Sequence, residues 1–334
     1  MASSPLTLRG YIAEVQRALE QLDGLLLGDL LSIRNRRHVL PIAEALRSHS
    51  VDIAEFHHLI PQPFGNMVLE HLQACVALGC PRLAYDHQHT VFLALVDMSK
   101  TSSWCLQSFD VVAVDLRLLA HRLDSETEQS AGAGGGAEGT RDDLCGKLIS
   151  EWRATLREFD DLGKPLAMLM IANQLIQISF KMRNFSILNT IIVNVNSNKN
   201  LGSDTISTFP SSVQVRFHFF MGRMSLFTNH NERAQERLSE ALRLCPPSPV
   251  KNRRLIFIYL ITINLLQGRL PSENLLRTYD LPAFFEISCA VRTGDVRLFN
   301  QGLNVHRDFF VRWGILLPVR KVRLLVYRSL FRKV

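Results

Sequence analysis

The chain has 334 residues, of which 47% are hydrophobic and 21% are charged, and its formal net charge is +7. This hydrophobic content is enough for a sizeable core and excludes an intrinsically disordered chain, which combines few hydrophobic residues with high charge. The length suits one large domain or two ordinary ones.

Hydrophobic residues recur at three- and four-residue steps along most of the chain, which is the spacing of amphipathic helices. No segment has a convincing strand pattern. The spacing predicts helices at Leu8–Leu22, Asp29–Ile33, Asn66–Leu78, Leu83–Met98, Trp104–Leu123, Leu144–Leu162, Leu166–Met182, Ile187–Val195, Val213–Phe227, Glu232–Leu244, Leu255–Leu266, Ser272–Thr278, Ala283–Val291, Val296–Val305, Phe309–Leu317 and from Val319 to the end.

Turn residues separate these helices, as at Gly163 with Pro165 and at Gly268 with Pro271. Short helices joined by tight turns favour an all-α fold, a right-handed superhelix of stacked helix pairs. One segment, 124–141, is acidic and then rich in Gly and Ala, so we expect a flexible loop there. The expected organisation is N-terminal helical repeats at 1–123, this loop, and a second helical part at 142–334.

The segment from Gly222 to Pro246 carries the spacing of a tetratricopeptide repeat. Small residues at Gly222, Ala234 and Ala241 would let two antiparallel helices approach closely, Leu238 would fill the space between them, and Pro246 would end the second helix. This match predicts a tetratricopeptide-like helix pair and says little about function.

The six cysteines are scattered and include no C-x-x-C, so we interpret them as reduced thiols of a cytosolic or nuclear protein. The longest hydrophobic runs, Leu255–Leu266 and Pro165–Phe180, fall short of the roughly 18 residues that a membrane span needs. Both indicate core helices.

No catalytic or cofactor motif is convincing. The G-x-G-x-x-A pattern at Gly132 follows an acidic stretch where a dinucleotide loop would follow a strand. His87 and His89 stand two residues apart in a predicted helix and should point to opposite sides, and the pair His57–His58 has no Cys/His partners. We therefore expect no enzyme, no metal and no cofactor.

Basic residues gather at the C-terminal end, where 307–334 holds eight Lys and Arg against one acid and so accounts for the whole net charge. A basic excess at one end suits nucleic acid or an acidic partner. On one continuous helix Lys321, Arg328 and Arg332 would lie within about 40° of one another and form a stripe. The candidate binding residues are Arg253, Arg254, Arg312, Arg320, Lys321, Arg323, Arg328, Arg332 and Lys333.

Apolar residues lie on almost the whole circumference of the last predicted helix, from Val322 to Phe331. A helix that lies on a membrane surface needs one polar face, whereas a helix that is apolar all round is buried between other elements. We therefore expect an interior helix and no membrane insertion.

Three segments resemble the PCI-domain family, which is named after subunits of the proteasome lid, the signalosome and an initiation factor. Within it, they are most similar to the PCI subunit of the nuclear transcription-and-export complex. The segments are "NQLIQISFKMRNFSILNTII" (Asn173–Ile192), "KNRRLIFIYLITINLLQGRLP" (Lys251–Pro271) and "FFVRWGILLPVRKVRLLVYRSLFRKV" (Phe309–Val334), with a weaker match at Val114–Asp124.

The resemblance implies a tetratricopeptide-like superhelix capped by a winged helix, and no catalysis. It also implies a large scaffold subunit and a small acidic disordered protein as partners, a basic surface for RNA or DNA, and a role in mRNA export in the nucleus, at the nuclear pore, with the cytoplasm as a second location. The chain stops where family members continue into the winged helix, so we expect an exposed apolar patch near its end. The alternative is a lid-type or signalosome-like subunit that binds only proteins.

Overall fold

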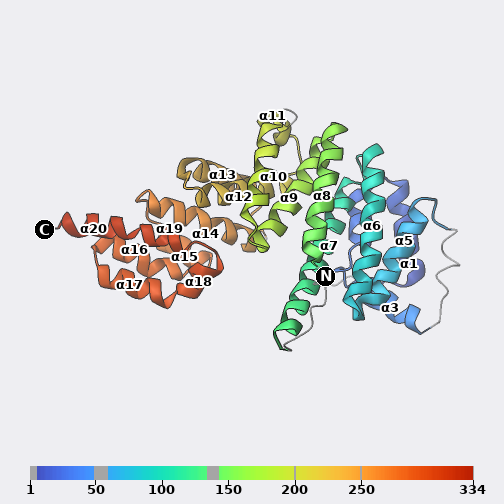
Figure 1. Ribbon diagram of the computed structural model, residues 1–334, viewed down its shortest axis with the longest axis horizontal. Helices are drawn as coiled ribbons and strands as arrows, with labels where there is room; N and C mark the ends of the chain where they lie inside the picture. Colours follow the sequence, from blue (N-terminus) through green and yellow to red (C-terminus); the bar gives the residue numbers. More distant parts are fainter. Residues whose placement is uncertain (1–5, 49–58, 134–142, 199–200, 249, 334) are drawn as a thin grey trace. The chain divides into compact units, whose positions relative to one another are not determined.

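The computed structural model describes residues 6–48, 59–133, 143–198, 201–248 and 250–333. Within these ranges every regular element is a helix and no strand occurs, which confirms the all-α fold predicted from the hydrophobic spacing (Figure 1). The packing divides the chain into two compact units, Met1–Gly202 and Ser203–Val334, called here the N-terminal and the C-terminal unit.

The N-terminal unit consists of helices that pack on their neighbours in the chain, such as α5 on α6, α6 on α7 and α8 on α9. Its elements are α1 (Leu8–Glu20), α2 (Gly24–Leu30), α3 (Val39–Arg47), α5 (Phe64–Val76), the 3₁₀ turn η1 (Ala77–Gly79), α6 (Pro81–Thr101), α7 (Leu106–Ala133), α8 (Leu144–Asp161), α9 (Pro165–Lys181) and α10 (Phe185–Ser197).

The C-terminal unit follows the same rule, with α12 on α13, α13 on α14 and α16 on α17. Its elements are α11 (Ser203–Ser207), α12 (Ser211–Phe227), α13 (Asn231–Leu244), α14 (Val250–Leu266), α15 (Glu273–Thr278), α16 (Ala283–Thr293), α17 (Val296–Val305), α18 (Arg307–Arg312), α19 (Leu316–Lys321) and α20 (Arg323–Phe331).

Helix ends follow the local chemistry of the sequence. Asp23 opens α2 by accepting hydrogen bonds from the backbone N–H groups of Leu25 and Leu26, and Asp295 opens α17 in the same way. Gly294 ends α16 with a left-handed backbone (φ 72°), and its missing side chain lets α20 approach, since a Cβ there would lie 2.6 Å from the Leu330 nitrogen. The turns predicted at Gly163 and Gly268 are confirmed, because both have positive φ.

The pair α12–α13 has the packing predicted for a tetratricopeptide-like hairpin. A Cβ on Gly222 would lie 2.6 Å from Cγ of Leu238, so the glycine makes room for that leucine. Leu238, Ala234 and Ala241 are completely buried, and α13 ends at Leu244, two residues before Pro246. Close helix crossing at small residues is therefore present here.

Two boundaries predicted from the sequence differ from the structure. The helix expected at Asp29–Ile33 starts earlier, at Gly24, because Asp23 caps it. The loop expected from residue 124 is wrong up to Ala133, since α7 continues to that residue and Arg122 pairs with Glu126 one turn on at 2.7 Å. The rest of that segment, 134–141, lies outside the described residues, and the packing divides the chain after Gly202.

The last helix, expected from Val319 to the end, is two helices. The backbone N–H of Val322 bonds to the carbonyl of Val319, a 3₁₀-type step that separates α19 from α20. With this step, Val319, Val322 and Val326 are all completely buried in the core of the C-terminal unit. Lys321 therefore belongs to α19, whereas Arg328 and Arg332 lie at the end of α20.

Candidate nucleic-acid and partner interface

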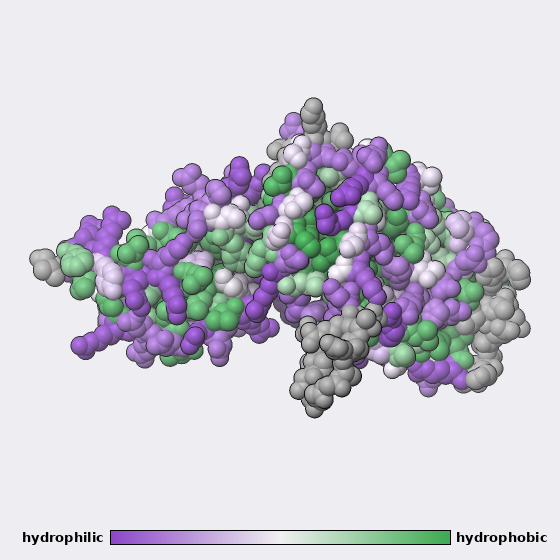
Figure 2. All heavy atoms as spheres, viewed as in Figure 1, coloured by the Kyte–Doolittle hydropathy of each residue, from purple (hydrophilic) through white to green (hydrophobic). Residues whose placement is uncertain are grey.

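The two units carry opposite net charge. The C-terminal unit has 20 Lys and Arg against 9 Asp and Glu, a net charge of +11, whereas the N-terminal unit has 18 against 22, a net charge of −4. The net charge of the C-terminal unit, +11, exceeds the net charge of residues 307–334, +7, so basic residues elsewhere in this unit also contribute. Figure 2 shows charged side chains alternating with hydrophobic ones over the helices near the C-terminus.

Four of the predicted arginines are exposed and have no side-chain hydrogen bond or ion pair with another described residue. Arg312 ends α18 and lies with its guanidinium 5.7 Å from the ring centre of Trp313. Arg320 lies in the last turn of α19, and Arg328 and Arg332 lie one turn apart at the end of α20. These four, Arg312, Arg320, Arg328 and Arg332, are called the outward arginines below.

The predicted residue Arg254 is engaged within the chain. Its Nε donates to the carbonyl of Tyr279 at 3.0 Å and its NH2 group donates to the carbonyl of Asp280 at 2.9 Å. Both carbonyls follow the C-terminus of α15, which carries partial negative charge. Arg254 therefore fixes the start of α14 to the end of α15, whereas its neighbour Arg253 is half-buried.

The remaining three predicted residues also have internal partners. Lys321 Nζ donates to Oδ1 of Asn229 at 2.5 Å, and Lys333 Nζ donates to the Thr293 carbonyl at the end of α16 at 2.9 Å. Arg323 donates to Oδ1 of Asn300 at 2.6 Å and lies over the Phe299 ring, 5.8 Å from its centre. These contacts hold α19 and α20 in place, so among the nine predicted residues the outward arginines are the exposed ones without a hydrogen-bonded partner in the described chain.

Large hydrophobic side chains lie between the outward arginines. Leu317, Leu324 and Phe331 are 68%, 71% and 74% exposed, so the apolar patch expected near the end of the chain is present. One side of α19 and α20 is thus packed in the core and the other side is open. A surface that mixes hydrophobic and basic groups can bind an acidic protein or the bases and phosphates of nucleic acid.

The histidines considered for metal binding do not form one site. Nδ1 of His87 lies 2.8 Å from Oε2 of Glu70 on α5, whereas Nε2 of His89 lies 2.7 Å from Oε2 of Glu151 on α8. The two side chains therefore leave α6 toward different helices, as their spacing predicted. His57 and His58 lie outside the described residues.

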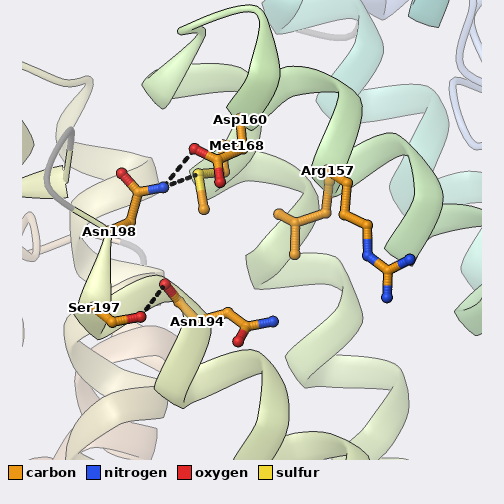
Figure 3. A pocket seen from close by; sticks show the side chains of 7 residues that line it. Arg157, Asp160, Met168, Asn194, Ser197 and Asn198 are labelled. Atoms are coloured by element: carbon orange, nitrogen blue, oxygen red, sulfur yellow. Dashed lines mark hydrogen bonds between the residues drawn. The ribbon is translucent and has the colours of Figure 1, made fainter.

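A pocket of about 390 Å³ between α8, α9 and α10 has no catalytic arrangement (Figure 3). Its carboxylate, Asp160, accepts a hydrogen bond from Nδ2 of Asn198 at 2.5 Å, and Ser197 donates to the backbone carbonyl of Asn194 at 3.2 Å. Arg157 points away from these groups in Figure 3. The lining contains no histidine or cysteine, so no general base is placed beside the serine.

A second pocket, of about 440 Å³ between α12 and α13, is lined by ionisable groups that engage one another. Arg243 binds Glu240 through two hydrogen bonds, and NH1 of Arg237 lies 3.4 Å from Nδ1 of His218. Burial, followed by the positive charge of Arg237, lowers the pKa of His218 to about 4. His218 is therefore neutral at pH 7.

One buried cluster was missed at the level of the sequence. His38, His71 and Cys75 are completely buried in the N-terminal unit, and their ligand-type atoms lie within 4.8 Å of one another. The spacing of His71 and Cys75, four residues apart on one helix, is visible in the sequence. His38 is 33 residues earlier, and only the packing of α3 on α5 brings it there.

The packing of successive helices on one another defines an α-helical repeat protein. None of the helices in the described part of the chain has the length and apolar character that crossing a membrane requires. No protein-family model matches the chain.

Individual relatives do match the chain. PCI domain-containing protein 2 of Xenopus laevis is 31% identical over 339 residues, which cover 98% of this chain and 82% of the frog protein. The Drosophila melanogaster homolog of PCI domain-containing protein 2 is 30% identical over 341 residues, with the same coverage. Enhanced ethylene response protein 5 of Arabidopsis thaliana is 26% identical over 91% of this chain and 70% of the plant protein.

The chain belongs to the PCI domain-containing protein 2 family. The family resemblance of the segments Asn173–Ile192, Lys251–Pro271 and Phe309–Val334 is thereby confirmed. PCI-domain proteins are scaffold-type subunits that bind protein partners in complexes, and they are not known as enzymes.

Proposed function

We propose that this chain is a non-enzymatic scaffold subunit of a nuclear complex that couples transcription to mRNA export. In this proposal it assembles with a large scaffold subunit and a small acidic protein, at the nuclear pore. The C-terminal unit binds nucleic acid through the outward arginines. Membership in the PCI domain-containing protein 2 family supports the scaffold role, and the four outward arginines are the observation that carries the nucleic-acid role.

The outward arginines have guanidinium groups whose hydrogen-bond donors are available to a phosphate. A guanidinium that already donates to a carbonyl or an amide has fewer donors for a phosphate, whereas the outward arginines have no such partner among the described residues. Arginine presents a planar fork of donors that fits phosphate oxygens. Each contact with a phosphate also releases condensed counterions, so a surface of this kind binds more strongly at low salt.

The same surface suits the acidic protein partner. Leu317, Leu324 and Phe331 supply hydrophobic contact area, and the outward arginines beside them supply positive charge. Hydrophobic side chains at the centre of an interface with charges around it are typical of protein–protein contacts. Nucleic acid and the acidic protein would then compete for the charges, but only the protein would need the hydrophobic residues.

The test is the salt dependence of binding to a single-stranded RNA. Replacing Arg312, Arg320, Arg328 and Arg332 by Gln removes four positive charges from the C-terminal unit. If each contacts one phosphate, the slope of log K against log salt falls by roughly 0.7 per contact, or about 3 in total. Fluorescence anisotropy at several salt concentrations measures this slope.

A matched control comes from the N-terminal unit. Arg9, Arg17, Arg36 and Arg157 are also exposed, and their guanidinium groups have no ion pair or hydrogen bond with another described residue. Replacing these four by Gln changes the net charge by the same amount and should leave the slope unchanged. Equal slopes for the wild type and the C-terminal variant would contradict the nucleic-acid role, and equal losses in both variants would reduce it to a general charge effect.

The second candidate function is a lid-type or signalosome-like subunit that binds only proteins. The exposure of Leu324 and Phe331 favours it, because phosphate contacts do not require hydrophobic side chains. It predicts that the chain co-purifies with partner subunits and has no measurable affinity for RNA at any salt concentration. Replacing Leu324 and Phe331 by Ser would then abolish co-purification, while the outward arginines could be replaced without effect.

A further inference from the structure

A group of side chains with metal-binding chemistry lies inside the N-terminal unit, and the proposed function makes no use of it. Nε2 of His38 lies 3.2 Å from Nε2 of His71, and Sγ of Cys75 lies 3.5 Å from the same His71 nitrogen. His71 and Cys75 are on successive turns of α5, and His38 comes directly before α3. All three residues are completely buried.

The separations agree with those of ligands around one zinc ion. Zinc binds imidazole nitrogen at roughly 2.0–2.1 Å and thiolate sulfur at about 2.3 Å, usually in a tetrahedral arrangement. In a tetrahedron of that size two nitrogens lie about 3.3 Å apart, and a nitrogen and a sulfur about 3.6 Å apart. The His38–His71 nitrogen separation of 3.2 Å and the Cys75–His71 sulfur–nitrogen separation of 3.5 Å are close to these values.

The hydrogen bonds around His71 direct its Nε2 lone pair toward the cluster. Nε2 of Gln88 on α6 donates to the Leu31 carbonyl at 3.1 Å, which turns Oε1 of Gln88 toward Nδ1 of His71 at 3.4 Å. Since an amide oxygen can only accept, Nδ1 of His71 carries the proton and Nε2 has the lone pair. A partner that fixes the second ring nitrogen in this way is typical of histidines that bind metal.

Hydrogen bonds alone do not satisfy this arrangement. With Nδ1 of His71 protonated, the one lone pair on its Nε2 faces both Nε2 of His38 and Sγ of Cys75, and it can accept a full hydrogen bond from only one of them. A single cation accepts a lone pair from all three atoms at once. Nδ1 of His38 has no partner among the described side chains, so His71 and Cys75 form the better-fixed half of the cluster.

The pKa values make the imidazoles of His38 and His71 neutral at pH 7. The thiol of Cys75 keeps its proton unless a cation stabilises the thiolate. Burial lowers the pKa of His71 to about 4, and burial together with His71 and Arg37 lowers the pKa of His38 to about 3, so both rings are neutral at pH 7. Burial, followed by the negative charge of Asp115, raises the pKa of Cys75 to about 12. A bound dication would offset this penalty by holding the thiolate, as metals do at coordinating thiols.

We propose that His38, His71 and Cys75 bind a structural Zn²⁺ ion that ties α3 to α5 in the N-terminal unit. Cys75 gives up its proton to solvent when the ion binds, and no redox change occurs. The three residues supply three of the four positions of a tetrahedral site. Because the ligands are fully buried, the ion enters as the unit folds and exchanges slowly afterwards.

The first test is the zinc content of the purified full-length chain, measured by native mass spectrometry. We expect about one zinc per chain in the wild type and a loss of at least about tenfold in Cys75→Ala and His71→Ala. Cys105→Ala is the matched control, because Cys105 is an equally buried thiol of the same unit that does not belong to the cluster. A wild-type chain without zinc, or a Cys75→Ala chain that keeps it, would overturn the proposal.

A second measurement tests the proposal even if the variants do not fold, because it uses the wild-type chain. The wild-type chain is unfolded in chelator and refolded with Co²⁺, which takes the place of zinc and absorbs visible light. We expect tetrahedral cobalt bands together with a thiolate-to-cobalt charge-transfer band, and the same spectrum for Cys105→Ala. Gln88→Ala should weaken the metal affinity by roughly 10- to 100-fold while leaving the ligands in place. A spectrum without the charge-transfer band would show that Cys75 is not a ligand.

Discussion

The N-terminal unit buries polar side chains where its helices meet, whereas the C-terminal unit has a core made mostly of hydrophobic residues and carries its charge outside. In the N-terminal unit the carboxylate of Asp115, on α7, is completely buried and accepts hydrogen bonds from Ser32, Ile33 and Arg34. In the C-terminal unit the groups that face solvent include the outward arginines and the hydrophobic residues between them. The buried polar contacts of the N-terminal unit specify how its helices pack. The exposed arginines and hydrophobic residues of the C-terminal unit remain available to bind another molecule.

This difference has a counterpart in what a mutation should do. Removing a buried polar group leaves its partners without hydrogen bonds in a region of low dielectric, which lowers stability. Removing an exposed charge changes the electrostatic field outside the protein and leaves the packing intact. We therefore expect substitutions in the N-terminal unit to affect mainly folding, and substitutions at the outward arginines to affect mainly binding.

The largest effect is expected for Asp115→Ala. The substitution leaves the hydroxyl of Ser32 and the backbone N–H of Ile33 without an acceptor, at a cost of about 4 kcal/mol in the free energy of unfolding. Chemical denaturation followed by circular dichroism measures this change. Asp97→Ala, which removes a carboxylate that is 76% exposed, is the control and should change stability by less than about 0.5 kcal/mol. Equal stabilities of the two variants would remove the contrast between buried and exposed charge.

A smaller effect is expected for Arg254→Gln in the C-terminal unit. The variant loses the hydrogen bonds to the carbonyls of Tyr279 and Asp280 and should lower the free energy of unfolding by about 1.5 kcal/mol. Arg328→Gln should have no measurable effect, because Arg328 has no such contact in the described chain. Thermal unfolding distinguishes the two. If Arg328→Gln is the more destabilising variant, the division into engaged and outward arginines is wrong.

The smallest effect concerns the dependence of stability on pH. The pKa of His218 is lowered to about 4 in the folded chain, first by burial and then by Arg237, while nearby Glu240 and Glu236 oppose the shift and Arg243 adds to it. The unfolded chain therefore binds the proton more readily, and the stabilising contribution present above pH 6.5 is lost as the pH falls toward 4. Between pH 6.5 and 5.5 the loss is about 1 kcal/mol.

The matching variants for this pH effect are His218→Gln and His306→Gln. The first should reduce the fall in unfolding temperature between pH 6.5 and 5.5, because it removes the group that binds the proton on unfolding. The second removes a histidine at the end of α17, outside the pocket that holds His218, and should retain the wild-type slope. An unchanged slope in His218→Gln would show that burial does not control the protonation of His218.

Much of the fold followed from local features of the sequence. The three- and four-residue spacing of hydrophobic residues placed most helices, and Gly163 and Gly268 marked turns because their backbone conformation is one that glycine adopts easily. The boundary at residue 124 was wrong because the composition of that segment outweighed its helix-stabilising pair, Arg122 with Glu126.

The sequence predicted the positive charge of the candidate interface, but not which of its basic side chains have partners within the chain. The sequence showed nine basic candidates near the C-terminal end. Whether a guanidinium is free depends on tertiary contacts, such as those of Arg254 with carbonyls about 25 residues later in the chain. The proposed zinc site could likewise be predicted only in part from the sequence. The spacing of His71 and Cys75 is a local signal, but the position of His38 is set by the packing of α3 on α5.

The most direct test of the contrast between the units is to map where RNA touches the full-length chain. Photochemical cross-linking to a uridine-rich single strand, followed by mass spectrometry of the peptides, gives the contacted segments without any mutation. We expect cross-links in the C-terminal unit, on peptides from α18 to α20 that contain Arg312, Arg320 and Arg328. Cross-links confined to residues 1–202, or spread equally over both units, would contradict the assignment of binding to the outward arginines.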